Sequence, residues 1–99
     1  MALADLIKEN KNIKYVKMKG NKLGDSGVKA LCKALIYTDV SSIDLSYNNF
    51  TIEGISHMKN LSYFNNKLKL INVKQNNINE KLFNRMIGEF VQNGVRIEK

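Results

Sequence analysis

Proline and tryptophan are absent from this sequence of 99 residues, and cysteine and histidine occur once each. A single cysteine, Cys32, excludes an intramolecular disulfide and favours a reducing compartment, so we expect a cytoplasmic protein. Cys32 and His57 are too few to supply the four ligands of a zinc site, and we expect no metal and no cofactor. No apolar run approaches the roughly 18 residues of a spanning helix, so we expect no membrane partner.

Acidic residues are scarce relative to basic ones, nine against 16, which gives a net charge of +7. Such a charge suits nucleic acid, an anionic membrane or an acidic protein as partner. Most of the basic residues are lysines spread along the chain without a basic block, which favours a general over-use of lysine. Nucleic-acid binding stays open as an alternative function, although the aromatic residues are not interleaved with a basic stripe.

A short pattern recurs three times along the chain. Each copy fits L-x-x-L-x-L-x-x-N-x-L with apolar residues at the L positions, and the copies cover residues 13–23, 40–50 and 68–78. Asn21 and Asn48 lie 27 residues apart, and Asn48 and Asn76 lie 28 apart. Five matched positions that recur at a near-constant spacing predict a solenoid of stacked repeats.

Each copy of the pattern predicts a short strand followed by a turn. Apolar residues alternate before the asparagine, as Val16 and Met18 do in the first copy, and a period of two places them on one face of a strand. The asparagine then stands where the chain leaves the strand. Its amide both donates and accepts, so we expect it to satisfy buried backbone groups in the turn and in the neighbouring repeat.

The segments between the copies have helical periodicity, over residues 25–37, 52–64 and 79–93. We predict that Asp25 and Asn79 are N-caps and that Asn93-Gly94 ends the last helix. The residues that we expect to face the core from these helices are Val28, Leu31, Cys32, Leu35, Ile36, Ile55, Met58, Leu61, Phe64, Leu82, Phe83, Met86, Ile87, Phe90 and Val91.

These elements predict an α/β fold, a short solenoid with parallel strands on one face and helices on the other. We expect a single domain over residues 1–99, with repeats that begin near residues 13, 40 and 68. A helix over residues 2–10 is predicted to cap the first repeat. The segment 95–97 repeats the strand signature and is predicted to close the other end.

The repeated pattern resembles the leucine-rich-repeat family, and the period near 28 with one helix per repeat resembles its ribonuclease-inhibitor-like branch. The closest piece is residues 21–35, and the resemblance covers residues 13–97. The later repeats depart from the branch after their asparagine, where residues 51–54 and 79–82 replace the Gly-Asp-Ser-Gly turn of the first repeat. The resemblance implies an asparagine ladder formed by Asn21, Asn48 and Asn76.

No catalytic constellation is present in the sequence. Cys32 and His57 could be imagined as nucleophile and base, but Cys32 falls on the apolar stripe of its predicted helix, where a cysteine is inert packing. The carboxylates fall at different repeat positions and form no acid/base pair. We therefore predict a non-enzymatic, monomeric module that binds another protein, for example as a scaffold. Regulation of an enzyme such as a GTPase, a role of some relatives of this branch, is a further alternative.

The predicted binding surface is the strand face that points away from the helices. Alternate residues stack there into columns, namely Tyr15, Ser42, Leu70 and Gly94, then Lys17, Asp44, Asn72 and Arg96, then Lys19, Ser46, Lys74 and Glu98. Tyr15, Leu70 and the neighbouring Tyr47 would be apolar groups in a polar surround, which suits an interface hot spot. The predicted partner-binding residues are Tyr15, Lys17, Lys19, Ser42, Asp44, Ser46, Tyr47, Leu70, Asn72, Lys74 and Arg96.

Overall fold

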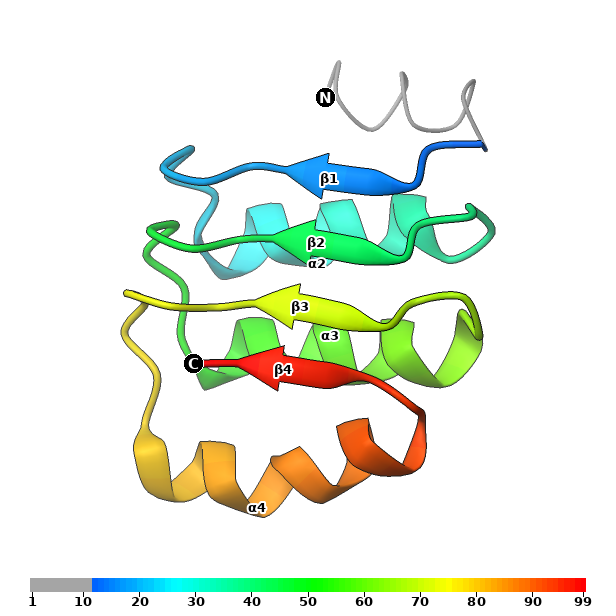
Figure 1. Cartoon of the computed structure of the whole chain (residues 1–99). Helices are drawn as coiled ribbons and strands as arrows, with labels where there is room; N and C mark the ends of the chain where they lie inside the picture. Colours follow the sequence, from blue (N-terminus) through cyan, green and yellow to red (C-terminus); the bar gives the residue numbers. More distant parts are fainter. Residues whose placement is uncertain (1–11) are drawn as a thin grey trace.

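The computed structural model of the chain describes residues 12–99, so the helix predicted over residues 2–10 lies outside the described residues. Strands and helices alternate along the described chain (Figure 1). The elements are β1 (Tyr15–Lys17), α2 (Gly24–Leu35), β2 (Ser42–Asp44), α3 (Ile52–Phe64), β3 (Leu70–Asn72), α4 (Glu80–Gln92) and β4 (Arg96–Glu98).

The four strands form one parallel sheet in chain order. The central residues of the first three strands are Val16, Ile43 and Ile71, which pair in register and are buried. The helices lie together on one side of this sheet, and each runs roughly alongside its strands (Figure 1). This arrangement confirms the predicted α/β fold with parallel strands on one face and helices on the other.

A continuous apolar core fills the space between the sheet and the helices. The α2 helix contributes Val28, Leu31, Cys32 and Leu35, and these residues were predicted to be buried. Phe50, from the turn after β2, is completely buried beside them in the same core. Each repeat therefore completes its apolar core only when the next repeat stacks on it, as expected for a solenoid.

Three residues that were predicted to face the core are exposed instead, namely Phe64, Leu82 and Val91. Phe64 is the last residue of α3, and its ring packs edge-on against the ring of Tyr63 with centroids 5.0 Å apart. Leu82 and Val91 belong to α4, which contacts only α3 and β4 among the described elements. Helical periodicity finds the apolar side of a helix, but the neighbouring elements decide how much of that side they cover.

The predicted N-cap role of Asp25 in α2 is wrong. The helix begins at Gly24, and its N-cap position, Leu23, makes no side-chain capping hydrogen bond. The Asp25 carboxylate instead accepts hydrogen bonds from Thr51 and Gly54, at the start of α3. By contrast, Asn79 caps α4 as predicted, because its Oδ1 accepts a hydrogen bond from the N–H of Leu82 at 3.0 Å.

Candidate functional site

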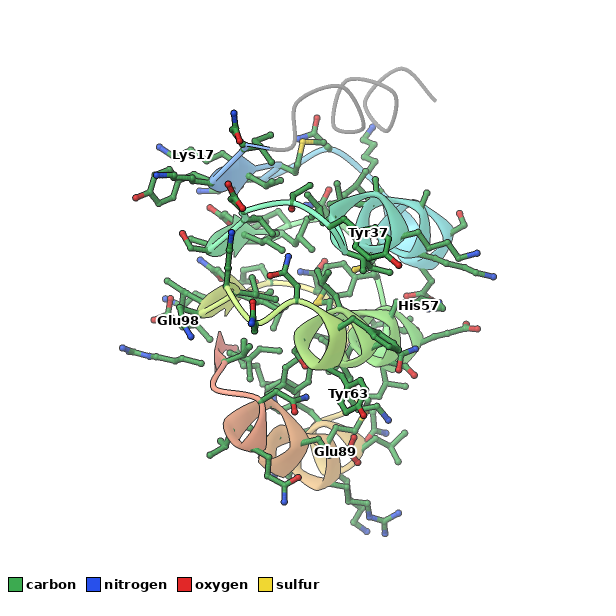
Figure 2. The ribbon with its side chains drawn as sticks, turned by 90° about the vertical axis from the view of Figure 1, so that its right-hand side faces the viewer. Lys17, Tyr37, His57, Tyr63, Glu89 and Glu98 are labelled. Atoms are coloured by element: carbon green, nitrogen blue, oxygen red, sulfur yellow. The ribbon has the colours of Figure 1, made fainter. Side chains whose placement is uncertain are left out.

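Two columns of side chains run across the sheet on the face that points away from the helices. The register places Tyr15, Ser42, Leu70 and Arg96 in one column, and Lys17, Asp44, Asn72 and Glu98 in the other. Figure 2 shows Lys17 and Glu98 on the sheet side of the molecule, opposite the helical side on which Tyr37 and His57 lie. We call this surface the strand face.

The predicted position of Arg96 is wrong, because the sequence alignment of the last strand is displaced by two residues. Arg96 pairs with Leu70 rather than with Asn72, and Glu98 takes the place beside Asn72. The chain enters β4 through Gly94, which has a φ of +76°. The N–H of Val95 still donates to the end of α4. A shift of two residues preserves the alternation of inward and outward side chains, so alternation alone could not detect it.

The predicted binding residues also differ in their solvent exposure. Tyr15 is 67% exposed and Tyr47 is 53% exposed, but Leu70 is only half-exposed. Ser46 is buried, contrary to prediction, and its N–H and hydroxyl both donate to Asp44 Oδ1, at 3.0 Å and 2.7 Å. In the next repeat, Lys74 donates its N–H to Asn72 Oδ1 in the same way, at 3.0 Å. Asp44 and Asn72 thus shape the turns that follow their strands.

Tyr47 occupies an unusual backbone conformation at the end of the strand face. Its φ is +58°, and the residues at the same repeat position, Gly20 and Gln75, have φ values of +72° and +59°. Side chains rarely adopt this left-handed region, so Tyr47 carries backbone strain that glycine would avoid. The Lys19 ammonium lies over the Tyr47 ring, 5.2 Å from its centroid.

A hollow of about 400 Å³ lies beside Tyr47 at this end of the sheet. The residues that line it are Lys19, Asp44, Ser46, Tyr47, Asn72, Lys74, Gln75 and Lys99. Gln75 and Lys99 are absent from the predicted partner-binding residues, and Lys99 was missed because it follows β4, whose register was misjudged. Lys17, Lys19 and Lys74 form no ion pair within residues 12–99. The strand face therefore combines two exposed tyrosines with unpaired positive charge.

The three repeated asparagines hold the turns beneath this surface. Asn48 Oδ1 accepts the N–H of Asn21 at 2.9 Å, and Asn76 Oδ1 accepts the N–H of Asn48 at 2.8 Å. Their amide groups donate back to the preceding repeat, to Met18 O at 2.8 Å and to Leu45 O at 3.0 Å. Asn48 and Asn76 thus each tie their own turn to the one before it, whereas the Asn21 amide donates to Met18 and Lys19 within its own turn.

Cys32, the cysteine considered as a nucleophile, is buried in the apolar core. Burial raises the pKa of the Cys32 thiol to about 12, so the nucleophilic thiolate is disfavoured. Residues 12–99 contain no group of three or more His, Cys, Asp or Glu side chains that could hold a metal ion. Over the same residues, none of the helices has the length and apolarity to cross a membrane.

Among the carboxylates of residues 12–99, Asp25 is the one whose pKa departs clearly from its ordinary value. Burial opposes its ionisation, but the hydrogen bonds from Thr51 and Gly54 outweigh burial and hold its pKa below the ordinary value. The nearby His57 adds a smaller favourable charge interaction. Through these hydrogen bonds the Asp25 carboxylate joins the start of α2 to the start of α3 in the next repeat.

Comparison with known proteins points to one family. The family model described as "Leucine Rich repeat" matches residues 9–32. Human NACHT, LRR and PYD domains-containing protein 13 is 31% identical over 80 residues, which cover 79% of this chain and 8% of the human protein. Pig ribonuclease inhibitor is 27% identical over 96 residues, which cover 95% of this chain and 21% of the inhibitor. The tropomodulin C-terminal domain of Caenorhabditis elegans has a TM-score of 0.81 at 15% identity, covering 99% of this chain and 61% of that chain.

The repeated pattern, the parallel sheet and these matches identify the chain as a member of the leucine-rich-repeat family. Within the family, the similarity to ribonuclease inhibitor supports the ribonuclease-inhibitor-like branch. The chain spans less than a quarter of the length of either of the two relatives. The similarity to tropomodulin concerns the fold alone.

Proposed function

We propose that this chain is a non-catalytic, cytoplasmic module that binds another protein through its strand face. The observation that carries the proposal is the combination on one face of two exposed tyrosines, Tyr15 and Tyr47, with lysines that lack ion-pair partners among residues 12–99. Tyrosine is enriched among residues that dominate binding energy at protein interfaces. The name of one relative, ribonuclease inhibitor, describes action on another protein and supports the same class of function.

The strained backbone of Tyr47 offers a clean test of this proposal. Tyr47→Gly removes the ring and also relieves the strain at a φ of +58°, so stability should change little while binding is weakened. If the ring is a binding anchor, the variant should weaken affinity by about 1–2 kcal/mol. Gln75→Gly is the matched control, because Gln75 has a φ of +59° and an exposed polar side chain.

The measurement is the affinity of each variant for a partner captured on the immobilised chain, together with its melting temperature. Tyr15→Ala should weaken the same interaction without lowering stability, since the side chain is exposed. Equal losses for Tyr47→Gly and Gln75→Gly would show that the ring is not the anchor. Tight binding of a random oligonucleotide that falls steeply with salt would point to a nucleic-acid partner instead.

A further inference from the structure

Aromatic side chains also gather at the opposite side of the molecule, at the C-terminal ends of α2 and α3. Tyr37 is 85% exposed, Tyr63 is 71% exposed and Phe64 is 64% exposed. Tyr37 and Phe64 each lie 16 residues after the asparagine of their repeat, at Asn21 and Asn48, so they occupy equivalent positions in neighbouring repeats. Figure 2 shows Tyr37 and Tyr63 on the helical side of the molecule, away from the strand face.

A surface groove of about 320 Å³ lies between α2 and α3, and Phe64 is the one of these three aromatics that lines it. Its lining residues are Lys29, Cys32, Lys33, Ile36, His57, Asn60, Leu61 and Phe64. The floor is apolar, because Cys32 and Leu61 are buried and Ile36 is half-buried. The volume lies at the lower end of ligand pockets, about 300 Å³, which suits a few side chains of a peptide.

The charge around the groove has one sign. Lys29 and Lys33 line it without an ion-pair partner among the described residues, and no Asp or Glu lines it. The Asp25 carboxylate is directed to the start of α3, where it accepts hydrogen bonds from Thr51 and Gly54. Because the Asp25 carboxylate is already hydrogen-bonded there, the ammonium groups of Lys29 and Lys33 remain available to an anionic ligand.

We propose that the groove between α2 and α3 binds an acidic peptide segment of a partner protein, with an apolar side chain inserted against Ile36, Leu61 and Phe64. The carboxylates of the segment face Lys29 and Lys33. The apolar floor selects for a side chain that a nucleic acid does not have, and the lysines select against a basic segment. This second surface is independent of the strand face, so the failure of one proposal leaves the other standing.

Three synthetic peptides of about twelve residues, the size of a short helical recognition segment, test the proposal. The first combines glutamates with leucine and phenylalanine at helical spacing, the second replaces glutamate by lysine, and the third replaces the apolar residues by serine. Each is titrated into the isotope-labelled chain and followed by NMR. We expect the first peptide alone to shift the methyl signals of Ile36 and Leu61. Equal shifts with the second or third peptide, or shifts confined to the strand face, would overturn the proposal.

Variants of the chain then locate the contact. Lys33→Glu should weaken binding of the first peptide by about fivefold or more, because it replaces an attraction by a repulsion. Phe64→Ala should weaken it by about fivefold, and Tyr15→Ala is the matched control, with 67% exposure against 64%. Circular dichroism confirms that each variant is folded. Unchanged affinity in both groove variants would refute the groove as the binding site, and Tyr47→Gly should leave the affinity unaltered.

Discussion

Asn48 links the first two repeats. The loss of folding free energy on its replacement by alanine can be estimated from its hydrogen bonds. The side chain is completely buried. Its Oδ1 accepts the N–H groups of Asn21 at 2.9 Å and Leu23 at 3.3 Å. Its Nδ2 donates to the carbonyls of Met18 at 2.8 Å and Ser46 at 3.1 Å.

Two of these four backbone groups keep a partner in Asn48→Ala. The Met18 carbonyl also accepts from Asn21 Nδ2, and the Ser46 carbonyl also accepts from the N–H of Gly20. Two N–H groups are therefore left unpaired, each at a cost of about 1–3 kcal/mol when buried. Both lie near the surface, which favours the lower end, so we expect a loss of about 2–3 kcal/mol. For a domain of this size that lowers the melting temperature by about 10–20 °C.

The assay is urea denaturation of the wild type and the variant followed by circular dichroism, with thermal melts as a second measure. Asn49→Gly is the control, because Asn49 is exposed and its φ of +56° suits glycine. Alanine would be strained at that position, so it would not be a neutral control. We expect Asn49→Gly to change stability by no more than about 0.5 kcal/mol. If the two variants lose equal stability, the hydrogen bonds of Asn48 do not hold the repeats together.

Three further predictions concern the helices. Gly54→Ala should destabilise the fold by about 1–3 kcal/mol, because a Cβ there would lie 2.9 Å from Phe50 Cδ1 and 3.0 Å from Asp25 Oδ1. A Cβ at Gly88 would have no atom within 4 Å, so Gly88→Ala should stabilise the fold by about 0.5–1 kcal/mol in the same denaturation assay. Because hydrogen bonds lower the pKa of Asp25 below 3.8, its ionised form stabilises the fold at neutral pH and that contribution disappears as the pH falls through the lowered pKa. The stability deficit of Asp25→Asn should thus be full at pH 7 and shrink below about pH 4, and a deficit that is constant with pH would contradict this. Cys32 should resist iodoacetamide at pH 8 until the chain is unfolded in urea, and rapid labelling of the folded chain would show that the thiol is accessible.

The sequence by itself determined the repeat, its period and the strands that the period implies. The asparagine spacing and the alternation around Val16, Ile43 and Ile71 were enough to predict three strands and the register in which they pair. These signals are local and recur, so each copy supports the assignment of the others. The alternation also predicted which side of each strand faces solvent, and it placed Tyr15 on the exposed side.

The fourth strand shows where that reasoning ends. It has no asparagine to align, so two alignments that differ by two residues satisfy the alternation equally. The structure selects the one in which Ile97 pairs with Ile71. Lys99 thereby lines the hollow beside Tyr47, a placement that the sequence did not predict.

Apart from the hydrogen bonds of the repeated asparagines, the side-chain contacts between repeats were decided by the tertiary structure alone. Asp25 lies 26 residues from Thr51, and no local rule distinguishes a carboxylate that caps its own helix from one that caps the next. The burial of Ser46 and the exposure of Phe64 likewise depend on which groups a neighbouring segment brings near. A periodic pattern specifies the direction of a side chain, whereas the solvent exposure of that side chain depends on all the surfaces packed around it. For that reason the groove between α2 and α3 could be found only in the folded chain.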